Sequence, residues 1–220
     1  MSTQQTPAKI TYFDVRGRAE VIRLIHEFTN TPYVERRVSV EEWPAAKPTF
    51  PFGQLPVYEE GDLLLNQSHA IYRHLARKLD LYGDDESEHC RCDMVEEFFV
   101  DAQNNIGGFF WNPEFHQKRE QYEKEQLPEL LDKVDRLYAG NGGNGFFVGT
   151  RVSYVDFIAW HFLDYVRALS AATLGRYTKL AAFKQSLQST PAIATYLASE
   201  RRPRTLTVAM APFGGTPETS

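Results

Sequence analysis

The segment from Phe52 to Ile71 restricts the possible folds of this chain more than any other part. It reads Phe-Gly-Gln-Leu-Pro, then a hairpin pattern around Gly61-Asp62, then Asn-Gln-Ser-His-Ala-Ile. Pro56 is confined to a strand start, edge or bulge, and it pushes Leu55 towards extended geometry. Ser68 is a good N-cap, and a helix N-terminus attracts a carboxylate or phosphate. The segment therefore predicts an extended backbone edge beside an anion-binding helix end, which together suit a small acidic peptide ligand.

The N-terminal part, residues 1–82, alternates between strand and helix patterns. Residues 10–13 and 33–40 are rich in β-branched and aromatic residues, which favours strands, and residues 18–28 carry an apolar helical stripe between them. A hairpin at residues 57–65 and a helix over 68–79 follow. A strand, a crossover helix and a second strand imply parallel pairing, so this order predicts an α/β domain of the thioredoxin kind.

The remainder of the chain has a helical pattern. Residues 83–89 are polar and charged, and we expect them to link two domains. Helices are predicted over 90–107, 115–138, 155–169, 180–187 and 192–197. We therefore expect an all-α domain over residues 90–204. Residues 205–220 are rich in Pro, Gly and Thr, which predicts a flexible tail.

Charge and cysteine content exclude several classes of function. The net charge of -5 argues against nucleic acid as a partner, because phosphate binding rests on a basic surface. Residues 1–8 lack the apolar core of a signal peptide, and the chain has no run of about 18 apolar residues that could cross a membrane. Cys90 and Cys92 are expected to point apart on a helix and not to bridge. We therefore expect a cytoplasmic protein in a reducing compartment, without a nucleic-acid or membrane partner.

Two motifs have structural explanations. Residues 140–145 match the G-x-G-x-x-G pattern, but a predicted helix precedes them and no helix start follows, so we interpret them as a loop rather than a nucleotide site. Residues 153–156 have the form of a capping box at a helix start. The histidines show no metal-ligand spacing, so no metal site is indicated.

Polar residues surround the predicted edge at Leu55. Taken alone, Tyr12 is best interpreted as an ordinary strand aromatic, but it ends the first predicted strand, where α/β sheets present ligand-facing residues. Binding sites often lie at strand ends and loops, so we expect a shared polar site near Leu55 and Pro56. Its other members would be Arg18, Trp43, Lys47, Gln54 and Gln67.

Several separated motifs resemble cytosolic glutathione transferases, most of all the sigma class, with the pi class next. They occupy residues 12–20, 42–44, 51–56 and 66–71, and the likeness runs from about residue 9 to 203. The resemblance implies a thioredoxin-like domain followed by an all-α domain, and a homodimer. Phe52 would then be an aromatic plug that inserts into the partner subunit.

The resemblance also implies roles for individual residues. Tyr12 would activate the glutathione thiol, Pro56 would follow a cis peptide bond, and Asp101 would reach the glutathione of the neighbouring subunit. The implied glutathione-binding set is Tyr12, Arg18, Trp43, Lys47, Gln54, Leu55, Pro56, Gln67, Ser68 and Asp101. Phe13, Trp111 and Phe162 are the expected walls of the electrophile pocket, and each is also consistent with a place in the core.

The chemistry of a thiol agrees with this assignment. A free thiol has a pKa of about 8.5, and a hydroxyl that donates to the sulfur stabilises the thiolate and lowers that pKa. Leu55 would pair its backbone with the cysteinyl part of glutathione as an added strand. Gln67 and Ser68 would hold the γ-glutamyl carboxylate at a helix end. Trp43 and Lys47 would hold the glycyl end.

We therefore expect a glutathione transferase that acts on small hydrophobic electrophiles, with prostaglandin isomerase or peroxidase activity as further candidates. The alternative is a non-catalytic binding or structural protein on the same fold. A thioredoxin-type oxidoreductase is excluded because no Cys lies near the first strand-to-helix turn. Some sigma enzymes carry an acidic residue that contributes to a metal site where Val100 stands here. We therefore expect no metal requirement, although Glu96 and Glu97 are close in sequence.

Overall fold

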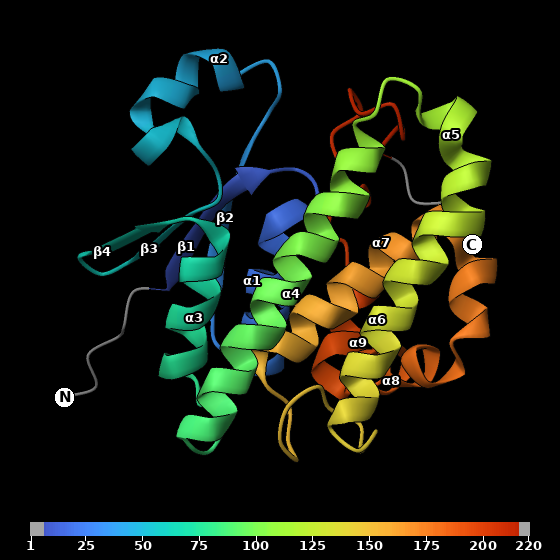
Figure 1. Cartoon of the computed structure of the whole chain (residues 1–220). Helices are drawn as coiled ribbons and strands as arrows, with labels where there is room; N and C mark the ends of the chain where they lie inside the picture. The colour runs from blue at the N-terminus through green and yellow to red at the C-terminus, as the bar shows by residue number, and fades with distance from the viewer. Residues whose placement is uncertain (1–6, 216–220) are drawn as a thin grey trace.

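The computed structural model describes residues 7–215 and shows a mixed sheet packed beside a helical part (Figure 1). Its strands are β1 (Ala8–Phe13), β2 (Tyr33–Val38), β3 (Val57–Glu60) and β4 (Leu63–Asn66), in the order β2-β1-β3-β4. β1 and β2 are parallel, whereas β3 is antiparallel to both β1 and β4. The predicted parallel pair and hairpin are thus confirmed. Residues 1–8, in which the sequence shows no apolar core of a signal peptide, lie mostly outside the described residues.

Helices α1 (Glu20–Phe28) and α3 (Ser68–Lys78) pack together beside the sheet. Their apolar faces bury Ile22 and Ile25 on α1, and Ile71 and Leu75 on α3. A short 3₁₀ turn (Gly17–Ala19) precedes α1. Between β2 and β3 the chain forms α2 (Trp43–Ala46) and two more 3₁₀ turns, Lys47–Thr49 and Pro51–Gly53. This architecture is the predicted thioredoxin-like domain.

The second part is helical, as predicted, with different helix ends. It contains α4 (Glu86–Phe110), α5 (Phe115–Gln121), a π segment (Tyr122–Gln126), α6 (Leu127–Gly140), α7 (Tyr154–Arg176), α8 (Thr178–Gln188) and α9 (Pro191–Leu197). α4 begins inside the expected linker because the Asp85 side chain accepts a hydrogen bond from the Glu88 N–H at 2.9 Å and caps the helix. Figure 1 shows α4 between the sheet and α6.

α7 is the central helix of this part. Its first two turns are buried on all sides, which is typical of a helix inside a core. The predicted capping box is present: the Asp156 carboxylate accepts hydrogen bonds from the Ser153 N–H and the Phe147 N–H, both at 2.8 Å. The carboxylate therefore fixes both the start of α7 and the loop before it.

A buried ion cluster joins the two parts. Arg16 pairs with Asp164 of α7 at 2.9 Å, and Arg202 pairs with both Glu20 at 2.8 Å and Asp164 at 2.9 Å. Burial alone would raise the pKa of Asp164, but Lys184, Arg202 and Arg16 hold it below its ordinary value. The cluster anchors the β1-to-α1 turn to the helical part.

The expectation of a flexible tail is wrong for residues 205–215. The Arg16 N–H donates to the Thr205 carbonyl at 2.8 Å, and Leu206 is fully buried. The Phe213 ring stacks on Phe110 with centroids 4.1 Å apart. The apolar side chains of the tail thus pack against residues that are distant in sequence. Residues 216–220 of the predicted tail lie outside the described part of the chain.

Candidate active site

The Tyr12 hydroxyl lies at the end of β1, half-buried. Thr11 pairs with Val57 in the antiparallel register, so Tyr12 lies next to Pro56 at the end of the ladder. The Tyr12 oxygen accepts a hydrogen bond from the Arg18 N–H at 3.1 Å, which leaves its own proton free to be donated. Burial raises the pKa of Tyr12, although the Arg18 N–H and the Arg18 charge act in the opposite direction. The hydroxyl therefore stays protonated at neutral pH.

Gly17 lies directly against this hydroxyl. Its φ is +40°, and a Cβ at this position would be 2.6 Å from the Tyr12 oxygen. The Gly17 N–H donates to the Leu206 carbonyl at 3.0 Å, and its own carbonyl accepts from His161 Nε2 at 2.8 Å. Burial lowers the pKa of His161 to about 4, so this imidazole is neutral and carries its proton on Nε2. α7 and the tail therefore hold the turn that supports Tyr12.

The Leu55 backbone forms the free edge that the sequence predicts. The Leu55–Pro56 peptide is cis, as the resemblance implies. Asn66 Nδ2 donates to the Gln54 carbonyl at 3.0 Å and to the Pro56 carbonyl at 2.8 Å, which fixes the loop on both sides of Leu55. The Leu55 N–H and carbonyl make no hydrogen bond within residues 7–215. An extended peptide can therefore pair with this edge.

α3 begins at Ser68 as predicted, but its N-cap residue differs from the prediction. Gln67, not Ser68, occupies the N-cap position, with a positive φ of 73°, and Ser68 is the first helical residue. Gln67 Nε2 donates to Gln54 Oε1 at 2.8 Å. Ser68 is buried, and its hydroxyl has no partner of good geometry among the described residues. The first N–H groups of α3, with these two side chains, form an end that suits a carboxylate.

Three other predicted residues make contacts in the N-terminal part or with α4. The Trp43 ring lies edge-on to Phe13 with centroids 5.2 Å apart. Lys47 is exposed, and its aliphatic stem lies over Gly53. Arg18 is exposed and donates to Asn104 of α4 at 3.4 Å. These contacts involve Phe13, Gly53 and Asn104, and a role of the three residues at the Leu55 edge stays a prediction.

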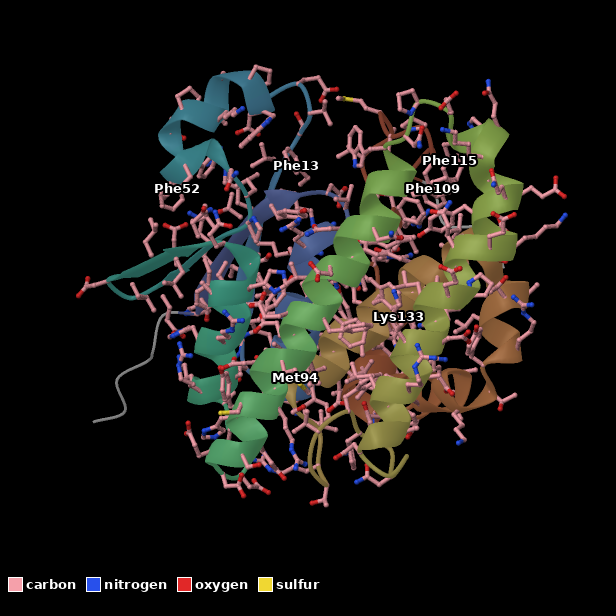
Figure 2. All side chains as sticks on the ribbon, viewed as in Figure 1. Phe13, Phe52, Met94, Phe109, Phe115 and Lys133 are labelled. Carbon is pink, nitrogen blue, oxygen red and sulfur yellow. The ribbon has the colours of Figure 1, made fainter. Side chains whose placement is uncertain are left out.

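A cavity of about 460 Å³ opens beside Tyr12. It lies between the β1-to-α1 turn, α4, α7 and the tail, and its walls include the predicted Phe13 and Trp111. Figure 2 shows Phe13 between the α2 region and the end of α4. Phe162 does not line the cavity: it is fully buried, with its ring 5.5 Å from that of Phe99, because the next position on α7 faces the core. The prediction for Phe162 is therefore wrong.

Other cavity residues were missed at the level of sequence. His161, Tyr165, Leu206, Thr207 and Val208 line the cavity, together with Gly17. Neither the alternation of apolar residues in a strand nor their helical spacing indicates that α7 and the tail contact the β1-to-α1 turn. The available sequence signal was Arg16-Gly17-Arg18, which lies within the motif of residues 12–20. It does not indicate which distant residues these three contact.

Two acidic residues of α4, the predicted Asp101 and Glu96, do not line the cavity. Asp101 is exposed on α4 and makes no hydrogen bond or ion pair with any other described residue. Glu96 is buried and accepts a hydrogen bond from the Tyr154 hydroxyl at 2.8 Å, while it also pairs with Arg73 at 2.5 Å. Glu96 is therefore committed to a structural network. Over residues 7–215, no cluster of metal-ligating side chains and no helix long and apolar enough to cross a membrane is found.

Comparison with known proteins identifies the family. The description "Glutathione S-transferase, N-terminal domain" matches residues 8–77, and "Glutathione S-transferase, C-terminal domain" matches residues 100–200. Rat hematopoietic prostaglandin D synthase is 34% identical, with 90% of this chain and 97% of that protein covered. A glutathione S-transferase of Dirofilaria immitis is 32% identical, with 86% of this chain and 91% of that protein covered.

Solved structures agree with these matches. The pi-class glutathione S-transferase of Onchocerca volvulus has a TM-score of 0.83 and 32% identity, with 87% of this chain and 92% of that chain covered. The sigma-class enzyme of Fasciola hepatica has a TM-score of 0.83 and 27% identity, with 91% of this chain and 99% of that chain covered. The chain therefore belongs to the glutathione S-transferase family, whose enzymes use glutathione as co-substrate.

Proposed function

We propose that this chain transfers the thiolate of glutathione to small hydrophobic electrophiles, with Tyr12 as the catalytic residue. The observation that carries the proposal is the Tyr12 hydroxyl, whose oxygen accepts the Arg18 N–H while its proton stays free beside the cavity. A donor in this position can act on a sulfur atom held at the neighbouring Leu55 edge.

The Tyr12 hydroxyl would donate a hydrogen bond to the glutathione sulfur. Such a bond favours the thiolate over the thiol, because a charged acceptor binds a donor more strongly. A hydrogen bond to a charged group contributes about 1.5–3 kcal/mol, which corresponds to a lowering of the thiol pKa by roughly one to two units. A thiolate fraction is then present at neutral pH, and its sulfur attacks the electrophile in the cavity.

The Leu55 edge and the α3 end would bind the rest of glutathione. The cysteinyl backbone would pair with the Leu55 N–H and carbonyl, since both are without partners in the described chain. The γ-glutamyl carboxylate would lie at the α3 N-terminus, near Gln67 and the buried Ser68 hydroxyl. Trp43 and Lys47 would contact the glycyl end.

We also propose that the enzyme is a homodimer in which each subunit completes the site of the other. Asp101 is exposed on α4 and would reach the glutathione of the partner subunit. Phe52 is a large apolar side chain that is 79% exposed, which suits insertion into a partner. Figure 2 shows Phe52 on the side of the molecule remote from α5 and α6. Sedimentation that shows a stable, active monomer would contradict this proposal.

The test is a comparison of wild type with Tyr12→Phe over a panel of electrophiles. The panel contains aryl halides, unsaturated carbonyls, hydroperoxides and a prostaglandin endoperoxide, since two candidate activities are isomerase and peroxidase. We expect the variant to lose about two orders of magnitude in kcat/KM while its glutathione affinity is nearly retained. Unchanged kinetics would exclude the role of Tyr12. Glutathione binding without turnover of any member of the panel would favour the non-catalytic alternative.

A further inference from the structure

The short backbone stretch that faces Tyr12 is held at every polar group by a different part of the chain. The tail and α7 bond to the N–H and the carbonyl of Gly17. The Arg18 N–H donates to the Tyr12 oxygen at 3.1 Å, and the Arg18 carbonyl accepts a hydrogen bond from the Tyr72 hydroxyl at 2.5 Å. Of these four bonds, three fix the turn and one reaches the hydroxyl that would activate the thiol.

Tyr72 is the contribution of α3 to this turn. It lies one helical turn after Ser68, is 1% exposed, and meets the His69 ring edge-on with centroids 5.1 Å apart. A phenylalanine would fill the same space in the core, so packing alone does not explain the hydroxyl. Buried tyrosine hydroxyls find a hydrogen-bond partner, and here that partner is the carbonyl of Arg18. Tyr72 is not part of the cavity lining, so it can act on the reaction only through other residues.

The Tyr72 hydroxyl remains a donor over the pH range in which a thiol titrates. Burial raises the pKa of Tyr72 well above its ordinary value, and burial raises that of Tyr12 as well. Replacing Tyr72 by phenylalanine removes one oxygen and leaves every charged group in place. The neighbouring ionisable groups that stay unchanged are Arg18, Arg23, Glu96, His161 and Tyr165.

We propose that Tyr72 is a positioning residue for catalysis, which holds the Arg18 backbone so that the Arg18 N–H stays bonded to the Tyr12 oxygen. The proposal rests on the proposed transferase function. At 3.1 Å this bond is close to the upper limit of about 3.2 Å for N–H···O, so a small displacement of Arg18 weakens it. Because linked hydrogen bonds polarise one another, a Tyr12 oxygen that accepts the N–H makes its own O–H a stronger donor to the sulfur. Tyr72 thus lowers the pKa of the bound thiol through Tyr12.

The pH profile of Tyr72→Phe tests this proposal. We would measure kcat/KM with glutathione and chlorodinitrobenzene from about pH 6 to about pH 9.5, where the rate follows the thiolate fraction. Below the thiol pKa we expect the variant to be slower by about threefold to tenfold, the value of one hydrogen bond, with the pKa of the profile raised by about half a unit to one unit. Above both pKa values the thiol is fully ionised, so the two rates should converge. The glutathione Kd should stay within about twofold, because Tyr72 does not contact the ligand.

Tyr122→Phe is the matched control. Tyr122 is 2% exposed, and its hydroxyl donates to the Asn105 side chain at 2.6 Å, outside the cavity lining. Its removal also costs one buried hydrogen bond, so urea unfolding should show a loss of stability in both variants. The pH profile should move only in Tyr72→Phe.

A double variant separates positioning from general damage to the fold. In a Tyr12→Phe background, Tyr72→Phe should leave the bound thiol pKa unchanged, because the group through which it acts is gone. An unchanged profile in Tyr72→Phe, a loss by the same factor at all pH values, an equal shift in Tyr122→Phe, or a further shift in the Tyr12→Phe background would each overturn the role of Tyr72 and leave the transferase function intact. A wild-type chain that binds glutathione without turnover would instead refute the proposed function.

Discussion

Gly17→Ala should damage catalysis by displacing the Tyr12 hydroxyl, although Gly17 itself carries no side chain. The new Cβ would be 2.6 Å from the Tyr12 oxygen and 2.8 Å from Tyr12 Cε1. Ordinary contact begins at 3.4 Å, so the hydroxyl must move by about 0.8 Å. A misplacement of this size at a reacting centre costs on the order of a hundredfold in rate. We therefore expect kcat/KM to fall by roughly tenfold to a hundredfold.

The same substitution also has a cost in stability. Ala at φ +40° lies in the left-handed region, which costs about 1–2 kcal/mol. Gly61→Ala is the matched control: its φ is +56°, and no atom lies within 4 Å of the new Cβ. Urea unfolding should show a similar loss of stability in both variants, whereas initial rates with glutathione and an aryl chloride should fall only in Gly17→Ala.

Two results would refute this reasoning. A folded Gly17→Ala variant with wild-type kcat/KM would show that the position of Tyr12 does not depend on Gly17. Equal losses of activity in Gly17→Ala and Gly61→Ala would show that the effect comes from backbone strain alone. Circular dichroism of both variants confirms that the comparison is made between folded proteins.

The remaining predictions concern glutathione binding, a helix start and the buried ion cluster. Gln67→Ala should weaken glutathione binding in calorimetry by about tenfold, which corresponds to one lost hydrogen bond. The exposed Gln117→Ala is the control and should leave the affinity unchanged. An intact affinity in Gln67→Ala would exclude Gln67 from the site. Asp156→Ala should lower the free energy of unfolding by about 2–4 kcal/mol, because it leaves the buried N–H groups of Ser153 and Phe147 unpaired. An effect as small as that of the exposed Glu129→Ala would contradict this role of Asp156. Burial would raise the pKa values of Glu20 and Asp164, but the neighbouring cations lower both. The two carboxylates therefore stabilise the fold fully above about pH 4, and this stabilisation is lost as the pH falls through their lowered pKa values. Urea unfolding from about pH 7 to about pH 3 should therefore show a loss that Asp164→Asn reduces, and a flat profile in wild type would contradict the cluster's role.

The sheet was predictable because its signals are local. Residues 10–13 and 33–38 carry β-branched and aromatic side chains, and Gly61-Asp62 gives the hairpin its turn. Helix ends were less predictable, because they depend on which side chain caps them. Asp85 extends α4 into the expected linker, and Gln67 rather than Ser68 occupies the N-cap of α3, although this helix begins at Ser68 as predicted.

Long-range contacts explain what the sequence could not show. The composition of residues 205–215 predicts a loose tail, yet the Leu206 carbonyl accepts the Gly17 N–H and the Phe213 ring stacks on Phe110. Tyr72 and Tyr12 are also far apart in sequence, and no periodicity connects α3 with the end of β1. The roles of the glutathione residues came from the resemblance, whereas Gly17, Asn66 and Tyr72 emerged only from the packing.

The central claim is that the Tyr12 hydroxyl stabilises the glutathione thiolate. The direct test is a pH titration of the ultraviolet thiolate absorbance of bound glutathione, in wild type and in Tyr12→Phe. We expect a bound thiol pKa roughly one to two units below the free value of about 8.5 in wild type, and a value near 8.5 in the variant, with the glutathione Kd nearly unchanged. The same bound thiol pKa in both proteins would contradict the claim.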